Sequence, residues 1–307
     1  MWRRIGKMSE KKHGLRRVAG YFVNHRLLNW MPDKPYLQIF YYAEFGKFID
    51  FKNPKTFNEK LNWLKLYYRR PDLIKLVDKY EVKKYIADKI GEQYIIPTIG
   101  VWNKFEDINF DELPDQFVLK CTHDSGGLVV CKDKSKLNLG EAKAKIEKSL
   151  ANNYYLWCRE WPYKNVKPRI IAEKYMEDTR SLDLKDYKFF CFNGKIKCFK
   201  VDFDRFTKHC ANYYTENGEL LEFGEIVCPP NNQKHLEIEE PVLNEMKRIA
   251  EKLASDYPFV RVDFYDVDGK IYFGEMTFYP AAGLGRFTSN EWDKKIGDWL
   301  VLPDKIN

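Results

Sequence analysis

The stretch FVRVDFYDVDGKIYFGEMTFYPAAG, residues 259–283, has the pattern of two β-strands joined by a turn at Asp268-Gly269. Side chains on a strand alternate between its two faces, and here each strand carries charge where a purely structural strand would place an apolar residue. The pattern is typical either of a surface hairpin whose acids face water or of a hairpin whose acids hold a cation. The residues in question are Arg261 and Asp263 in the first strand and Glu275 and Thr277 in the second.

Two carboxylates on one sheet face repel each other unless a cation lies between them, and carboxylate oxygens suit Mg²⁺. A strict two-residue turn at Asp268-Gly269 would leave Glu275 on the opposite side of the sheet from Asp263. The two carboxylates converge only if the connection has an odd number of residues or a bulge intervenes. We therefore predict a three-residue loop, Val267-Asp268-Gly269, with Gly269 in the left-handed conformation.

Composition bounds the class of protein. A chain of 307 residues is long enough for two domains or one large one, and its net charge of +7 indicates an acidic partner such as a nucleotide, an anionic polymer or an anionic lipid surface. The seven cysteines are odd in number and scattered, with no CxxC pair, which argues against a disulfide framework or a zinc site. With no signal peptide and no long apolar run in sight, we expect a cytoplasmic protein, at most attached to a membrane surface.

The first 17 residues hold seven lysines and arginines against one acid, Glu10. An arm of this kind either contacts anionic lipid at the inner face of the membrane or is a solvated terminus.

Three further segments carry local structure signals. Thr56 or Asn58 is expected to cap a helix, residues 241–255 are expected to form an amphipathic helix, and Asn193-Gly194 is the strongest hairpin signal in the chain. Residues 117–131 have the pattern of a strand, a glycine-rich bend and a second strand. This pattern is typical of a flap whose N–H groups cover a phosphate, or of an ordinary loop hairpin. Neither a Walker A sequence nor a GxGxxG fingerprint is present in the sequence.

Together these segments resemble the ATP-grasp superfamily, and specifically its teichuronopeptide-biosynthesis (TupA-like) family, over about residues 55–302. The family implies an α+β fold in which two α+β subdomains clamp ATP, after a smaller, mainly helical N-terminal region. On this basis we expect regions at 1–75, 76–172 and 173–307. The resemblance lies in TFNEKLNWLKL (56–66), LVDKY (76–80), IIPTIGVW (95–102), FVLKCTHDSGG (117–127), IIAEKYME (170–177), DYKFFCFNGKIK (186–197) and the opening hairpin.

The resemblance also implies site residues and the cofactors ATP and Mg²⁺. Lys120 matches the lysine that reaches the α- and β-phosphates, and Asp186 falls where a carboxylate holds the ribose. Lys188 is a further phosphate contact, and Arg261 matches the arginine aimed at the reacting acyl phosphate. The flap is represented by His123, Ser125, Gly126 and Gly127, the adenine hinge by Glu173, Lys174, Tyr175 and Met176, and the Mg²⁺ ligands by Asp263, Glu275 and Thr277. The sequence departs from the usual pattern at Thr277, where many ATP-grasp enzymes have Asn, and at Asp124, where the flap usually has Gly.

The family implies a carboxylate–amine ligase that works through an acyl phosphate, forming an amide between an amino compound and a uronic-acid-containing surface polysaccharide or its precursor. The alternatives are a glycosyltransferase or accessory protein of capsule or exopolysaccharide biosynthesis, and a nucleotide-binding regulator without turnover. We expect a nucleotide, an acidic sugar polymer and an amine as partners, and no nucleic acid. Asp202-Phe203-Asp204 and Asp266-Val267-Asp268 are the DxD tripeptides that a metal-dependent glycosyltransferase would use, both in weak context.

Overall fold

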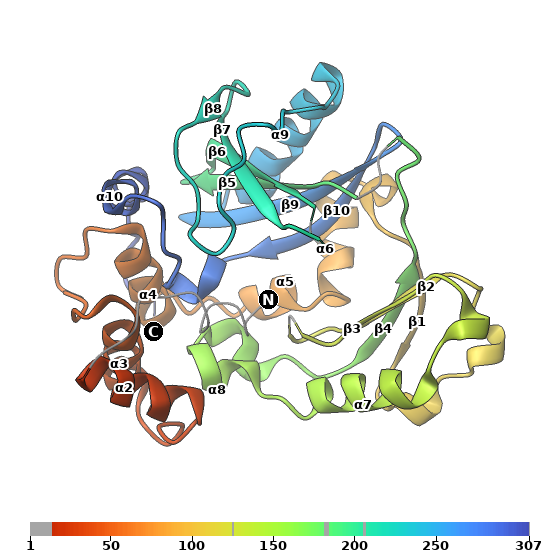
Figure 1. Cartoon of the computed structure of the whole chain (residues 1–307), viewed down its shortest axis with the longest axis horizontal. Coiled ribbons are helices and arrows are strands. Elements are labelled where there is room, and N and C mark those ends of the chain that lie inside the picture. The colour runs from red at the N-terminus through yellow and green to blue at the C-terminus, as the bar shows by residue number, and fades with distance from the viewer. Residues whose placement is uncertain (1–13, 125, 181–183, 205–206, 307) are drawn as a thin grey trace.

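Two antiparallel sheets and a group of N-terminal helices make up the structure (Figure 1). The computed structural model describes residues 14–124, 126–180, 184–204 and 207–306. In Figure 1 the six-stranded sheet lies at the top, beside helix α9 (Glu240–Ala254), and the four-stranded sheet lies at the lower right, with helix α7 (Leu139–Leu150) below it. The N-terminal helices lie at the lower left. The predicted α+β class is confirmed; the predicted region boundaries stay predictions.

Among the other helices of the described residues, the first five α-helices precede the sheets. The α-helices are α2 (Leu15–Asn24), α3 (Asp33–Phe45), α4 (Phe57–Tyr67), α5 (Leu73–Val77), α6 (Glu81–Ile90), α8 (Tyr154–Cys158) and α10 (Asn290–Trp299). The 3₁₀-helices are η1 (Glu92–Tyr94), η2 (Phe105–Asp107), η3 (Phe110–Glu112), η4 (Lys134–Lys136), η5 (Trp161–Asn165) and η6 (Pro280–Gly283). None of the helices in the described ranges is long and apolar enough to cross a membrane.

Helix α4 begins with a capping box. The Thr56 hydroxyl accepts a hydrogen bond from the Glu59 N–H at 3.3 Å, and the Glu59 carboxylate accepts one from the Thr56 N–H at 3.1 Å. Both donors would otherwise lack a partner in the first turn. The cap is therefore Thr56, one of the two residues that the sequence indicates.

The four-stranded sheet has the order β1-β4-β2-β3. Its strands are β1 (Thr98–Trp102), β2 (Phe117–Cys121), β3 (Leu128–Cys131) and β4 (Ile170–Lys174). Alternate residues of β2, such as Phe117 and Leu119, are buried in a small core with Ile146 of α7. The intervening residues Val118 and Lys120 therefore lie on the opposite face of the sheet.

The six-stranded sheet has the order β10-β9-β5-β6-β7-β8. Its strands are β5 (Asp186–Phe192), β6 (Lys195–Phe203), β7 (Cys210–Thr215), β8 (Leu220–Leu221), β9 (Phe259–Val267) and β10 (Lys270–Thr277). The predicted hairpin at Asn193-Gly194 is present, with both residues at positive φ. Helix α9 contacts β9 and is amphipathic as expected, with Val242, Met246, Ile249, Ala250 and Leu253 all buried.

The β9–β10 connection differs from the predicted three-residue loop. The turn is the two-residue Asp268-Gly269, with φ of 52° and 82°, so only the left-handed conformation of Gly269 is as predicted. The carboxylates still converge, because the register shifts between Phe273 and Glu275 and leaves Gly274 as an extra residue. A Cβ at Gly274 would lie 3.1 Å from the Asp263 carbonyl oxygen, so glycine suits this bulge.

Candidate active site

Strand pairing places a row of charged side chains across four strands of the six-stranded sheet. Asp263 on β9 pairs with Glu275 on β10 and with Lys188 on β5, and Lys188 pairs with Lys200 on β6. Residues opposite each other in a ladder point to the same face. The four side chains therefore project from one face, acidic at the β10 edge and basic toward β6.

Arg261 lies between the acidic residues of this row. Its Nε and Nη2 atoms lie 2.7 and 2.6 Å from the two carboxylate oxygens of Asp263. Nη2 also lies 2.8 Å from Glu275 Oε1 and 3.0 Å from Thr277 Oγ1. The structure thus brings together all four residues that the sequence assigns to this hairpin, and the cation between the carboxylates is the Arg261 guanidinium.

Asp263 and Glu275 differ in their protonation. Burial raises the pKa of the Asp263 carboxyl to about 7, although Arg261 opposes this effect. The Glu275 side chain is 47% exposed. Desolvation by the surrounding protein would raise the pKa of Glu275, but Arg261 and the Thr277 hydroxyl outweigh this effect and lower the pKa to about 2. Glu275 is therefore the more acidic of the two, and Arg261 is the cation that favours the ionised form of the buried Asp263. Carboxylate and hydroxyl oxygens are the ligands that a hard divalent cation such as Mg²⁺ prefers, and in this structure Arg261 contacts all three of these side chains.

Lys188 is surrounded by carboxylates. Its Nζ donates a hydrogen bond to Asp186, lies 2.5 Å from Asp202 Oδ2 and lies 3.9 Å from Asp263 Oδ2. The predicted residues Asp186 and Lys188 are therefore adjacent to Arg261, Asp263, Glu275 and Thr277, which we call the Arg261 cluster. Asp202 belongs to one of the DxD tripeptides, and in this structure its carboxylate is paired with lysine.

Lys200 extends the row and was missed from sequence. Its Nζ lies 3.2 Å from Glu225 Oε2 and 3.8 Å from Asp202 Oδ1. The Tyr213 hydroxyl donates to Glu225 at 2.7 Å. Burial would lower the pKa of Lys200, but Asp202 and Glu225 outweigh it and raise the pKa. Glu225 comes from a segment with no sequence signal, so only the folded chain shows this pairing.

Asp202, His209 and Cys228 also form a group of potential metal ligands in the described part of the chain, with donor atoms within 4.8 Å of one another. Lys188 and Lys200 already place two positive charges beside the Asp202 carboxylate. A divalent cation at Asp202 would be repelled by both lysines, so this group is a poor metal site.

The four-stranded sheet presents a cationic pair. Lys120 Nζ lies 2.6 Å from Glu173 Oε2, and Lys83 Nζ, from α6, lies 2.5 Å from Glu173 Oε1. The two lysines lower the pKa of Glu173 despite its burial, which would raise it. Lys120 and Glu173 are both predicted site residues, whereas Lys83 was missed because its role depends on where α6 packs.

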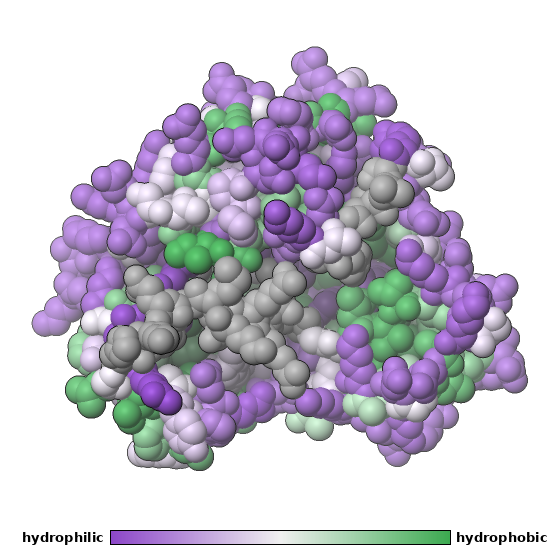
Figure 2. All heavy atoms as spheres, in the orientation of Figure 1, coloured by the Kyte–Doolittle hydropathy of each residue, from purple (hydrophilic) through white to green (hydrophobic). Residues whose placement is uncertain are grey.

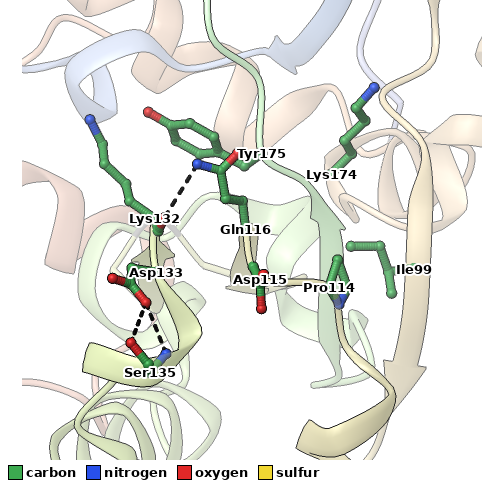
Figure 3. Close-up of a pocket in the computed structure, with 9 residues that line it drawn as sticks. All are labelled: Ile99, Pro114, Asp115, Gln116, Lys132, Asp133, Ser135, Lys174 and Tyr175. Carbon is green, nitrogen blue, oxygen red and sulfur yellow. Dashed lines mark hydrogen bonds between the residues drawn. The ribbon is translucent and has the colours of Figure 1, made fainter.

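A cavity of about 890 Å³ lies at the end of β4, where the predicted hinge begins (Figure 3). Lys174 and Tyr175 line it, and Lys132 Nζ lies 5.6 Å from the centre of the Tyr175 ring. The Gln116 amide, beside Tyr175 in Figure 3, donates to the Lys132 carbonyl oxygen at 3.3 Å. Met176 follows as a half-buried residue. The hinge residues thus border an open cavity with an aromatic ring and amide groups.

The Asp124 side chain is turned into the protein. Its carboxylate accepts hydrogen bonds from the Gly127 N–H at 3.2 Å and from the Ser149 hydroxyl of α7. Asp124 is buried, so its negative charge shapes the flap rather than facing a phosphate. The predicted flap residue His123 is buried as well. Its Nε2 lies 3.2 Å from the Asn152 carbonyl oxygen, and burial lowers its pKa.

The glycines of the flap have different surroundings. A Cβ at Gly127 would lie 2.3 Å from the Ser149 Oγ, so no larger residue fits there, whereas a Cβ at Gly126 would meet only Asp124 Oδ2, at 3.5 Å. Gly126 is exposed. Ser125, the remaining predicted flap residue, lies outside the described residues.

The faces of the two sheets act on each other electrostatically. Burial would lower the pKa of Lys120 on β2, but Glu173 outweighs it and raises the pKa, and the charge of Glu275 on β10 adds a smaller contribution. Lys79, which was missed from sequence, donates a hydrogen bond to the Asp124 carbonyl oxygen and also helps to lower the pKa of Glu275. Lys79 and Lys120 thus both interact electrostatically with Glu275, and Lys83 lies beside Lys120 on Glu173.

Apolar side chains lie beside Lys120. Leu128 and Val130 of β3 are exposed and pair with Lys120 and Val118 of β2. Figure 2 shows apolar atoms on the surface over the four-stranded sheet. An apolar strand face next to a lysine suits a ligand that has a flat ring and a charged group.

The comparisons with known proteins agree with this architecture. The model of the family described as TupA-like ATPgrasp matches residues 59–301, which is more than half of the chain. The expected ATP-grasp fold is thus confirmed. No curated protein sequence matches the chain.

Several solved structures are similar. D-alanine–D-alanine ligase from Bacillus anthracis shares 16% identity, with 72% of this chain and 58% of that chain covered and a TM-score of 0.38. The corresponding ligase from Helicobacter pylori also shares 16% identity, with 74% and 61% covered and a TM-score of 0.39. The ATP-grasp ligase PsnB, in complex with a phosphomimetic variant of its minimal precursor, Mg and ADP, shares 10% identity, with 69% and 53% covered and a TM-score of 0.38. The chain spans little more than half the length of these proteins.

Proposed function

The chain belongs to the TupA-like ATP-grasp family, and from this premise we propose that it is an ATP-dependent carboxylate–amine ligase that releases ADP and phosphate. One observation carries the proposal. Lys83 and Lys120 converge on Glu173 of the four-stranded sheet at 2.5 and 2.6 Å, while one hairpin of the six-stranded sheet gathers the oxygen ligands Asp263, Glu275 and Thr277 around Arg261. A nucleoside triphosphate needs both: fixed cations for its phosphates and oxygen ligands for its metal.

In the proposed reaction the γ-phosphate of ATP is transferred to a carboxylate, and an amine then displaces phosphate from the acyl phosphate. Lys79, Lys83 and Lys120 would bind the phosphates, with Glu173 holding two of these lysines in place. Arg261 would stabilise the negative charge that develops on the acyl oxygen during amine attack. The glycine-rich flap would exclude water from the acyl phosphate.

Mg²⁺, held by Asp263 and Glu275 with the Thr277 hydroxyl beside them, would screen the charge of the β- and γ-phosphates. The adenine would lie at the hinge, near Tyr175 and the apolar strand face of Leu128 and Val130.

For the substrates, we propose a uronic-acid-containing surface polysaccharide or its precursor as the acid, and an amino acid or another amine as the nucleophile. The protein would then serve polysaccharide biosynthesis at the cytoplasmic side of the cell envelope.

The test incubates the protein with Mg-ATP, pooled amino acids and glucuronate- or galacturonate-containing oligosaccharides, and follows ADP, phosphate, AMP and pyrophosphate separately. Hydroxylamine replaces the amines in a parallel reaction, since it traps an acyl phosphate as a hydroxamate. Acceptor-dependent ADP, phosphate and hydroxamate are expected, with loss of all three in Lys120→Ala. Release of AMP and pyrophosphate, or sugar transfer without ATP, would overturn the ligase in favour of a different chemistry.

A further inference from the structure

Helix α2 exposes an apolar face to solvent. Leu15, Val18 and Phe22 follow the i, i+3, i+7 spacing that places residues on one side of a helix, and all three are exposed. Leu15 is 74% exposed and Phe22 41%. Tyr21 lies at the edge of the same face and is also exposed. An ordinary surface helix would turn such a stripe toward the core.

Two more large apolar residues are exposed past the end of the helix. Trp30 is 78% exposed, and its indole N–H donates to the Leu27 carbonyl oxygen at 3.1 Å. Leu27 is exposed as well. Apolar atoms are visible at the lower left of Figure 2, where Figure 1 places α2 and α3. A group of exposed large apolar residues on a soluble protein marks an interaction surface. We call these six residues the α2 patch: Leu15, Val18, Tyr21, Phe22, Leu27 and Trp30.

The opposite side of α2 anchors the helix to the fold. Val23 is buried, α2 packs on α3, and the Arg16 guanidinium donates to the Glu44 carbonyl oxygen at 2.6 Å. The exposed side chains are therefore not needed to hold α2 in place, and they are free to contact something else.

The charge of the chain identifies that partner. Residues 1–34 contain nine lysines and arginines and two acids, Glu10 and Asp33, which is an excess of seven positive charges. The whole chain has 52 basic and 45 acidic residues, so residues 35–307 contain 43 of each and are neutral overall. The whole net charge of +7 thus belongs to the segment that carries the α2 patch. Arg17 and Arg26 of this segment are exposed.

We propose that this N-terminal segment docks the protein on the surface of an anionic lipid bilayer. The α2 patch would enter the headgroup region, where tryptophan and tyrosine rings are favoured, and the arginines would face the lipid phosphates. Neither apolar area nor basic charge alone selects this partner, but the two together in one short N-terminal segment do. The proposal goes beyond the ligase reaction and does not depend on it.

The experiment uses the full chain and sedimentation with vesicles of phosphatidylcholine alone or with one-third phosphatidylglycerol. Binding to the anionic vesicles is expected, with much weaker binding to the neutral ones and loss at high salt, because salt screens the arginines. The variants Val18→Ser/Phe22→Ser and Trp30→Ser should each lower the partition coefficient about tenfold or more. Val301→Ser removes a valine that is 67% exposed far along the sequence and should bind as the wild type does.

Two further measurements keep the outcome decisive. Circular dichroism and ATP turnover without vesicles should be the same for the α2 variants and the wild type, because the active-site row lies on other elements. The proposal is overturned if wild-type protein ignores anionic vesicles, or if the α2 variants bind them as well as Val301→Ser does. It is also overturned if gel filtration shows a dimer that the α2 variants dissociate, because a second copy would then cover the patch.

Discussion

Asp263 lies directly opposite Glu275 in the β9–β10 ladder, although only twelve positions separate them and the turn between them has two residues. An even-length connection in a regular ladder would send these carboxylates to opposite faces. The extra residue at Gly274 restores the common face, and Arg261 then contacts both side chains. A bulge beside a functional site re-aims a side chain without changing the strand that carries it.

The two carboxylates are predicted to differ in their effect on stability. Asp263→Asn leaves the buried Arg261 without its bidentate partner, so the free energy of unfolding should fall by about 3 kcal/mol. Glu275→Gln should cost less than about 1 kcal/mol, because Glu275 is half-exposed and Asp263 still pairs with Arg261. Both variants should weaken Mg²⁺-dependent ATP binding. Urea denaturation and calorimetry measure the two effects, and equal stability of the variants would contradict this account of Arg261.

Lys120→Ala is expected to weaken ATP binding about tenfold to a hundredfold, because a charge-assisted contact to a phosphate contributes about 1.5–3 kcal/mol. Removing Lys120 also leaves Glu173 paired with Lys83 alone. Lys120→Ala/Glu173→Gln should therefore bind ATP better than Lys120→Ala does. Lys136→Ala, at an exposed ion pair, serves as the control. Unchanged ATP affinity in Lys120→Ala by calorimetry would remove this lysine from the site.

Much of this site was predictable from sequence because it lies on strands. Period-two alternation by itself places Arg261 and Asp263 on one face of their strand, and the hinge and flap strands follow the same logic. The loop prediction failed because a three-residue loop and a two-residue turn followed by a bulge both place the two carboxylates on the same face. The residue that decides between them is Gly274, and its sequence context does not distinguish it from an ordinary strand glycine. Lys79, Lys83 and Lys200 were missed for another reason. They contact Asp124, Glu173 and Glu225 across 45, 90 and 25 positions, and no local pattern records such contacts.

The flap should tolerate change at one glycine and not at its neighbour. Gly127→Ala would place a methyl group 2.3 Å from the Ser149 Oγ and 2.7 Å from the Cys121 Sγ, so β2 and α7 must move apart. Overpacking of this kind costs about 1–3 kcal/mol. Gly126→Ala is the matched control, since its new methyl group meets only an ordinary contact. Thermal unfolding compares the two variants, and equal melting temperatures would show that the flap opens freely around Gly127.

Glu160 is predicted to make stability depend on pH. It is buried beside Cys158, whose Sγ lies 3.3 Å from Glu160 Oε1, and within the described residues its carboxylate has no lysine or arginine at ion-pair distance. The buried Lys65 donates instead to the carbonyl oxygens of Cys158 and Ala282 at 2.8 and 2.7 Å. Burial raises the pKa of Glu160 from 4.5 to about 7, although Lys65 opposes this and Glu275 reinforces it.

A carboxyl whose pKa is higher in the folded state binds its proton more tightly there than in the unfolded chain. The contribution of Glu160 to the free energy of unfolding is therefore fully present below about pH 4.5. It is lost as the pH rises toward 7, by about 3 kcal/mol in total, since each pKa unit corresponds to 1.36 kcal/mol. Glu160→Gln removes this titration. In the ligand-free protein it should be nearly neutral at pH 4.5 and should raise the free energy of unfolding by about 3 kcal/mol at pH 8. Glu222→Gln, at an exposed carboxyl, should change neither value. Urea denaturation at the two pH values decides the matter: a Glu160→Gln variant that gains no stability between pH 4.5 and pH 8 would mean that Glu160 is ionised in the folded protein and has a cation partner.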